Sequence, residues 1–228
     1  MHKGRNDAIL QTWPMSYLKS IKISAGAFLL FLYLFFCWLM LKIILQYIPA
    51  GTDTAFLGIK QDYTRSSFYL AVFYVHVFTS GFALLAGLTQ FSKPVLKSYP
   101  CLHRLQGRMY VFLILSLAGP SGLIIGFYAN GGIVSRISFC LLASLWIYFT
   151  YMAYYHARQR NFVAHKAFMY RSFALTVSAL TLRAWKYTLV GVFHPHPMDV
   201  YRVVAWLGWV PNLLLAEYLI YKNQNKWN

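Results

Sequence analysis

Residues 133–186 read IVSRISFCLLASLWIYFTYMAYYHARQRNFVAHKAFMYRSFALTVSALTLRAWK. Two apolar runs, at 133–155 and 166–190, are separated there by a short basic segment. That segment and the residue that follows it hold Arg158, Arg160 and Lys166. Each run is long enough for an α-helix that crosses a bilayer, which needs about 20 residues. Short basic connections are typical of the cytoplasmic side. The stretch therefore predicts two membrane helices joined in the cytoplasm.

The rest of the chain follows the same pattern. Its 228 residues are 59% hydrophobic and 11% charged, whereas soluble domains carry roughly 25% charged residues. The mean hydropathy is +0.48. Four further apolar runs occur, at 23–48, 67–91, 107–128 and 201–221. We therefore expect an all-α, polytopic membrane bundle of about six transmembrane helices, forming a single domain over residues 1–228.

The strong positive charge has an explanation in this topology. The chain has 21 Lys and Arg against 5 Asp and Glu, a net charge of +16. In a soluble protein this balance would indicate nucleic acid, but here the charges lie in short segments between apolar spans. We therefore expect anionic lipid headgroups as the partner, and we expect no nucleic-acid binding. The distribution predicts cytoplasmic termini and cytoplasmic segments at 92–106 and 156–165.

Two helix starts can be predicted from local sequence, and the first span is expected to be retained. Pro100 suits a first helical turn, which would place His103 one turn inside the third helix. Asn161 suits an N-cap, which would place His165 in the first turn of the fifth helix. The N-terminal region lacks the short apolar stretch and small-residue site of a cleavable signal.

Polar residues inside the apolar spans are the informative ones, because lipid makes them costly unless they face the bundle interior. A stripe at helical spacing on the fifth span contains His165, Met169, Ser172, Thr176, Ala179 and Arg183. A second stripe, on the second span, contains His76, Ser80, Ala83, Gly87 and Gln90. Close helix packing explains the small residues. It does not explain Arg183, which needs an acceptor, water or an anionic ligand.

The sixth span adds two polar side chains. Asn212 follows Pro211, which we expect to kink the helix, as we expect of Pro120 in the third span. Glu217 is the only acidic residue in any span, so it must be paired, protonated or solvated. We expect Arg171, near the same membrane face, to be its partner.

Histidines and basic residues gather at the expected cytoplasmic helix ends. The set comprises His103, Arg104, Arg108, His156, Arg158, Arg160, His165, Lys166 and Arg171. A belt that binds lipid phosphates accounts for every Arg and Lys, but it requires no histidine. Either the belt alone or a true ligand site fits the pattern. His76 and His156 are weaker candidates for metal ligands.

Several of these segments resemble a known family. They are HRLQGRMY at 103–110, GPSGLIIGFYANGG at 119–132, HKAFMYRSFALTVSALTLRAWK at 165–186 and PNLLLAE at 211–217. They resemble a bacterial family of multi-pass membrane proteins catalogued as domain of unknown function 2306, over most of the chain from His76 onward. The resemblance implies a multi-pass topology in a bacterial inner membrane and no established activity.

A weaker likeness is to the dihaem b-type cytochromes of ascorbate-dependent transmembrane reductases. That family places histidines on four successive helices, and this chain offers His76, His103, His156 and His165 in that order. The depths of His76 and His156 do not match, so only His103 with His165 keeps the geometry of axial ligands. The likeness implies one haem b and electron transfer between a quinol and a partner protein. Three basic residues would then lie near the haem propionates: Arg108, Arg171 and Lys97.

Other functional classes stay open at this point. His103, His156 and His165 could hold Zn²⁺ in a membrane hydrolase, with Glu217 as the one available carboxylate. A non-enzymatic lipid-binding or scaffold subunit would use the basic belt. A transporter is a further alternative. No P-loop, GxSxG, HExxH or dinucleotide fingerprint occurs.

Overall fold

The computed structural model describes residues 15–227. These residues form α-helices, short 3-10 helices and one π-helical segment, with no strand among them, which confirms the all-α class. The chain divides into two compact units, Met1–Leu39 and Met40–Asn228, which are described separately. Helix α1 (Met15–Leu45) begins in the first unit and ends in the second. In the first unit Phe28 and Phe31 are exposed, as expected for a helix that lipid surrounds.

An aromatic cap follows α1 in the second unit. It contains η1 (Ala55–Ile59) and α2 (Gln61–Thr64). Four buried side chains hold it to the next helix: Tyr47, Leu57, Tyr69 and Phe73. The amide of Gly51 also donates to the hydroxyl of Tyr74, over 3.0 Å. The cap therefore packs as a small aromatic core of its own.

Lys60 lies within this cap, with only 2% of the residue exposed. Its ammonium donates to the carbonyl of Tyr128 and lies 5.0 Å from the ring centre of Tyr63. Burial, and to a smaller extent the positive charge of Arg136, lower the pKa of Lys60 from its usual 10.5 to about 8. Both interactions of the ammonium favour the charged form, but desolvation outweighs them.

The next elements bring the chain across the bundle and back. Helix α3 (Ser67–Leu88) is capped by Ser66, whose hydroxyl accepts from the amide of Tyr69. After α3 come η2 (Thr89–Phe91), α4 (Lys93–Ser98) and α5 (Pro100–Phe112). The predicted helix start at Pro100 is confirmed, because Pro100 is the first residue of α5.

The third predicted span contains a π-helical segment. Helix α5 continues through η3 (Leu113–Ala118) into α6 (Gly119–Phe127), which carries Pro120 in its first turn. Proline lacks the N–H that would continue the helical ladder, so the irregularity lies where the sequence predicts it. Helix α7 (Ile133–Arg158) then returns without interruption.

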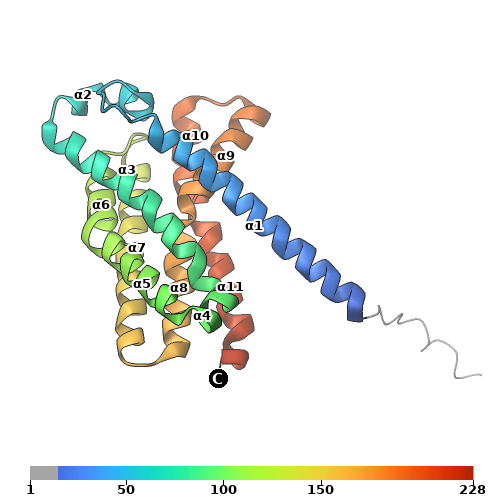
Figure 1. Cartoon of the computed structure of the whole chain (residues 1–228). Coiled ribbons are helices and arrows are strands. Elements are labelled where there is room, and N and C mark those ends of the chain that lie inside the picture. The colour runs from blue at the N-terminus through green and yellow to red at the C-terminus, as the bar shows by residue number, and fades with distance from the viewer. Residues whose placement is uncertain (1–14, 228) are drawn as a thin grey trace, which may run out of the picture. The chain divides into compact units, whose positions relative to one another are not determined.

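The last two passes are each built from two helices. Helices α8 (Phe162–Thr176) and α9 (Ser178–Phe193) meet at Val177, and α10 (Pro197–Leu207) and α11 (Val210–Trp227) meet at Gly208 and Trp209. In Figure 1, α8 and α9 together run from the end that carries the α7–α8 connection to the opposite end. The C-terminal end of α11 lies at the same end as α4 and the α7–α8 connection.

The side chain of Asn212 contacts both helix breaks, the one at Val177 and the one at Gly208 and Trp209. The amide nitrogen Nδ2 of Asn212 lies 3.2 Å from the carbonyl of Ala174, 2.9 Å from the hydroxyl of Thr181 and 3.2 Å from the carbonyl of Gly208. A side chain that bonds to backbone carbonyls in this way is a recognised cause of helix interruption. Asn212 therefore supplies hydrogen bonds to the carbonyls at both breaks, and the break in the fifth predicted helix was not predicted.

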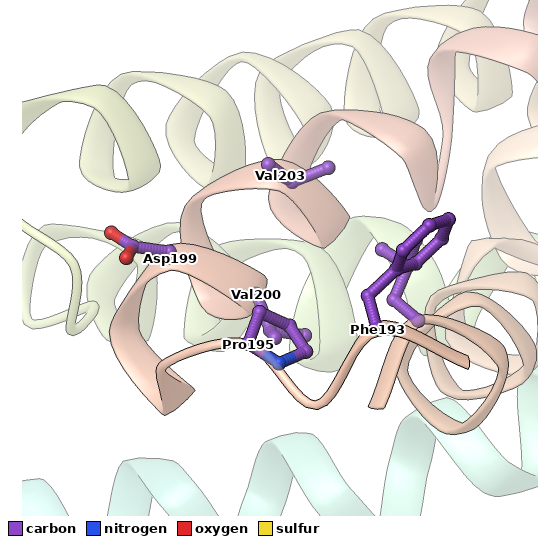
Figure 2. A pocket seen from close by; sticks show the side chains of 6 residues that line it. Phe193, Pro195, Asp199, Val200 and Val203 are labelled. Carbon is purple, nitrogen blue, oxygen red and sulfur yellow. The ribbon is translucent and has the colours of Figure 1, made fainter. Parts of the chain in front are cut away.

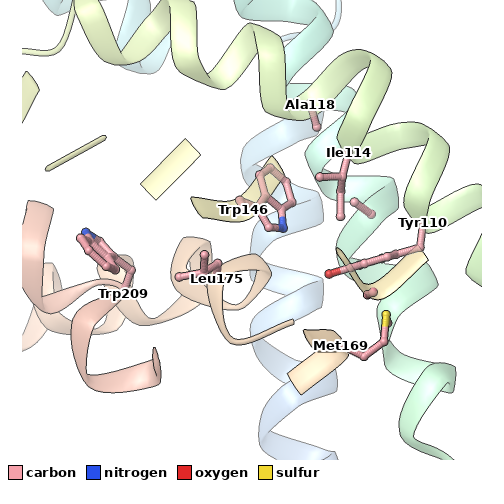
Figure 3. Packing of buried hydrophobic residues seen from close by; sticks show 9 residues of the cluster. Tyr110, Ile114, Ala118, Trp146, Met169, Leu175 and Trp209 are labelled. Carbon is pink, nitrogen blue, oxygen red and sulfur yellow. The ribbon is translucent and has the colours of Figure 1, made fainter. Parts of the chain in front are cut away.

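The main core lies where these helices meet (Figure 3). Its buried members are Ala83, Tyr110, Ile114, Ala118, Trp146, Ala153, Met169, Leu175 and Trp209. Gly87 of α3 makes close packing possible, because a Cβ at that position would lie 2.6 Å from the ring of Phe173 and 3.2 Å from the ring of Tyr110. The stripe of small residues predicted on the second span is thus a packing surface toward the C-terminal end of α3.

Five stretches of the described residues are long and apolar enough to cross a membrane. They are Gly26–Leu45, Ser67–Phe91, Pro100–Phe127, Ile133–Arg158 and Pro197–Asn223. The predicted span at 166–190 is not among them. The helix there is interrupted at Val177, between α8 with 15 residues and α9 with 16. The prediction of one continuous helix there is wrong. A multi-pass membrane bundle is nevertheless what the helices form.

Candidate functional site

His103 lies in the second turn of α5, and polar contacts with η2 hold this part of the helix. Gln90 donates through Nε2 to the carbonyl of His103 (3.3 Å), and the hydroxyl of Thr89 donates to Gln106. A Cβ at Gly107 would lie 3.0 Å from Oε1 of Gln90, so the glycine permits this close approach. The ring nitrogen Nδ1 of His103 is buried and has no hydrogen-bond partner among the described residues. Such a nitrogen carries an uncompensated desolvation cost.

His165 is held in a different way. Its helix is capped by Asn161, whose side chain accepts from the amide of Ala164 at 3.1 Å, so the predicted N-cap is confirmed. The ring nitrogen Nδ1 of His165 lies 2.8 Å from the carbonyl oxygen of Ala153 in α7. A carbonyl only accepts, so Nδ1 carries the hydrogen and Nε2 carries the lone pair in the neutral ring. Histidines that bind metals are usually fixed in this way.

The two histidines lie close enough to interact electrostatically. His165 also interacts with His156, whose ring stacks on Phe168 at 5.3 Å with an angle of 9° between the planes. The structure thus brings together the three histidines that the sequence analysis assigned to the cytoplasmic face. Within residues 15–227, however, no three His, Cys, Asp or Glu side chains converge as metal ligands, so the zinc hydrolase gains no support.

Arg171 and Glu217 form the ion pair that the sequence predicts. Nε of Arg171 lies 2.5 Å from Oε1 of Glu217, and NH2 lies 2.8 Å from Oε2, so the pair is bidentate through one edge of the guanidinium. The guanidinium carbon also lies 5.1 Å from the ring centre of Phe168. These contacts engage Arg171 within the protein, and its role beside an anionic ligand stays a prediction. Arg108 and Lys97 are exposed and form no ion pair among the described residues.

A buried hydroxyl cluster connects α5, α7 and α8. The hydroxyl of Tyr110 lies 2.8 Å from the hydroxyl of Ser172 and 2.7 Å from that of Thr176. Trp146 donates through its indole N–H to Thr176 (2.9 Å), and Thr150 lies 2.7 Å from Ser172. The sequence identified Ser172 and Thr176 as packing residues and missed their polar partners. Their shared helical face with His165 was the one available signal.

His76 contacts the π-helical segment. Its Nδ1 lies 3.0 Å from the carbonyl of Ala118, so it too carries the hydrogen on Nδ1. A Cβ at Gly122 would lie 2.8 Å from Cε1 of His76, so the ring packs tightly against α6. The carbonyl of Ala118 also accepts from the hydroxyl of Ser121 at 3.2 Å. His76 is separate from the other three histidines and stabilises the irregular part of the third pass.

Arg183 lies in α9, on the far side of the break at Val177 from His165. Its NH1 donates to the carbonyl of Ala179 in the same helix, over 2.7 Å. It interacts electrostatically with His76 and with Tyr47. Arg183 is therefore associated with the half of the bundle that contains His76.

The part of the chain that holds this arrangement matches a known protein family. The model of a family described as "Predicted membrane protein (DUF2306)" matches residues 73–220. This chain belongs to the DUF2306 family. The matched range starts three residues before His76 and includes His103, His156 and His165, together with Arg183, Asn212 and Glu217. No curated protein and no solved structure matches the chain.

One hollow of this DUF2306 member lies away from those histidines, between α9 and α10 (Figure 2). It has a volume of about 210 Å³ and is lined by Leu189, Phe193, Pro195, Asp199, Val200 and Val203. Its one charged residue, Asp199, pairs with Arg202 at 3.3 Å. His194 and His196, in the adjacent connection, are exposed. The hollow is an apolar feature of the surface and offers no group for catalysis.

Proposed function

We propose that this membrane protein binds haem b between α5 and α8, with His103 and His165 as axial ligands, and transfers electrons in the bacterial inner membrane. The observation that supports the proposal most is the hydrogen bond between Nδ1 of His165 and the carbonyl of Ala153. That bond leaves Nε2 as the only ring nitrogen of a neutral His165 with a lone pair, as an axial ligand requires.

The other residues of the site fit haem in part. His103 has a buried Nδ1 with no partner in the described chain, and it lies within electrostatic range of His165. Arg108 and Lys97 remain exposed at the same end of the bundle and could pair with propionates. Haem would supply a one-electron carrier. The protein's own residues would hold it, keep both imidazoles neutral and exclude water. We further propose that a quinol and a partner protein exchange electrons with it.

A second candidate function is supported by the exposed basic residues of the same face. Arg104, Arg108, Arg158 and Arg160 are all exposed, and none forms an ion pair within the described residues. Such a belt would bind anionic lipid headgroups, at about 1 kcal/mol for each basic residue near the surface. In that case the protein is a lipid-binding or scaffold subunit without a cofactor.

Expression with added haem separates the two functions. The purified protein should show a Soret band and a reduced-minus-oxidised α-band, and the haem-to-protein ratio should approach one. Both bands should be lost in His103→Ala and in His165→Ala. The matched control is His194→Ala, an exposed histidine in a connection far along the chain, which should keep both bands. A colourless wild-type protein, or bands that survive both axial substitutions, would refute the haem proposal and leave the lipid-binding function.

A further inference from the structure

A row of exposed side chains runs along the outer surface of α7. This helix is unbroken over 26 residues, and its buried side chains, which include Trp146 and Ala153, face the main core. On the side turned away from the core, six exposed residues follow one another at alternating spacings of four and three: Ile137, Leu141, Ser144, Tyr148, Tyr151 and Tyr155. From its first residue to its last the row covers about 27 Å of helix. We call this row the tyrosine seam.

The three phenols of the tyrosine seam have ordered rings but unpaired hydroxyl groups. Tyr148, Tyr151 and Tyr155 are 52%, 51% and 44% exposed, and their hydroxyl groups make no hydrogen bond among residues 15–227. The ring of Tyr148 packs edge-on against Phe168 at 6.4 Å, and the rings of Tyr151 and Tyr155 stack at 6.5 Å. The outer surface of α7 therefore presents three hydroxyl groups that the described part of the chain leaves without a partner.

Lipid supplies no partner at the depth of Tyr148. About 15 Å of helix separates Tyr148 from Arg158 at the end of α7, so Tyr148 lies near the middle of the helix. The hydrocarbon core is about 30 Å thick and contains no hydrogen-bonding group, so an unpaired hydroxyl group there is costly. Tyr155 lies within one turn of Arg158 and fits the aromatic belt at the membrane surface, but that belt does not explain Tyr148. A phenol at this depth indicates a partner on another protein surface.

We propose that the tyrosine seam is the contact surface of a symmetric dimer, in which α7 packs in parallel against α7 of a second copy of this chain. Copies of one chain insert in the same orientation, so a twofold axis along the membrane normal places each seam residue opposite its own counterpart at the same depth. A phenol can both donate and accept, so each tyrosine can bond to its counterpart without any complementary residue.

The rest of the seam fits the same arrangement. Its alternating spacing of four and three is that of two parallel helices in a left-handed pair. Ser144, near the middle of the seam, has a small side chain that lets two helix backbones approach closely. The seam contains neither His103 nor His165, so the dimer is independent of the proposed haem site.

Resonance energy transfer in lipid vesicles tests the dimer. The purified full-length protein is labelled with a donor or an acceptor on the exposed Cys101, and the two preparations are reconstituted together. Energy transfer should decrease as lipid is added, along the curve of a monomer–dimer equilibrium. A protein that stays monomeric even at a high protein-to-lipid ratio would mean that lipid or a different protein covers the tyrosine seam, and it would overturn the proposal.

A double substitution assigns the contact to the phenols. An interhelical hydrogen bond corresponds to about a threefold change in Kd, so Tyr148→Phe with Tyr151→Phe should weaken the dimer about tenfold. Unfolding of the dilute, monomeric protein in micelles should not change, which separates weaker association from misfolding. The matched control is Tyr221→Phe on α11, where 79% of the tyrosine is exposed, and it should dimerise as the wild type does. A double variant with wild-type affinity contradicts the proposal.

Cross-linking locates the interface independently of any phenol. In a variant whose native cysteines are replaced by alanine, Ser144→Cys should form a disulfide between two copies under mild oxidation, because disulfides require Cα atoms within about 7 Å of each other. The matched control is Leu215→Cys on α11, where 57% of the leucine is exposed, and it should stay monomeric. Cross-linking of Leu215→Cys but not of Ser144→Cys would place the interface on another helix and overturn the proposal.

Discussion

Removal of one oxygen atom from Tyr110 should measurably weaken the fold. Tyr110→Phe keeps the ring, which is fully buried with 0% of the residue exposed. It removes the hydroxyl that lies 2.8 Å from Ser172 and 2.7 Å from Thr176. Neither partner is left unsatisfied, because Ser172 keeps its contact with Thr150 and Thr176 keeps the indole N–H of Trp146. The loss is therefore that of two hydrogen bonds, without an orphaned group.

The magnitude follows from that count. A hydrogen bond contributes about 0.5–1.5 kcal/mol net in proteins, and between membrane helices the average is about 0.6 kcal/mol. Two such bonds predict a decrease of about 1–2 kcal/mol in the free energy of unfolding. If α5 and α8 are coupled through this oxygen, Tyr110→Phe and Thr176→Val should be non-additive by at least about 0.5 kcal/mol.

Reversible unfolding of the purified protein in mixed micelles, followed by circular dichroism, measures both quantities. The control is Tyr148→Phe on α7, where 52% of the tyrosine is exposed, and its effect should stay within about 0.5 kcal/mol. The hydroxyl cluster would be irrelevant to stability if Tyr110→Phe were as harmless as this control and additive with Thr176→Val.

Three further predictions concern charge and orientation. Glu217→Gln should destabilise the fold by about 1 kcal/mol, because the side chains of Arg171 and Glu217 are 21% and 46% exposed. In the same unfolding assay, the double variant with Arg171→Met should lose less stability than the two single variants added together. Lys60 has a folded-state pKa near 8, below its usual 10.5, so the unfolded chain holds the proton longer as pH rises. The free energy of unfolding should therefore increase between about pH 8 and 10.5, by up to about 3 kcal/mol, and Lys60→Met should lose this increase; equal pH profiles would contradict the assignment. Cys101 is exposed in a segment expected to be cytoplasmic, so an impermeant maleimide should label it in broken membranes but not in intact spheroplasts. Labelling of intact spheroplasts would reverse the orientation.

The features that could be predicted from sequence depend on one short segment each. The length of an apolar run and its flanking charges define a membrane span without knowledge of any neighbour. Pro100 and Asn161 set helix starts through their own backbone and side-chain chemistry, and both predictions are confirmed. Glu217 could be paired with Arg171 because it is the only acidic residue in any span, so few partners were available.

The features that only the tertiary structure decided depend on atoms supplied by another helix. The fifth pass breaks at Val177, where the chain has neither glycine nor proline, and Asn212 of α11 bonds to the carbonyl of Ala174 beside the break. The hydrogen of His165 is placed on Nδ1 by a carbonyl of α7. Tyr110 reaches two hydroxyls more than sixty residues away. Local sequence carries no signal for such contacts, because a backbone carbonyl is present at every residue and only packing determines which one lies within hydrogen-bond distance.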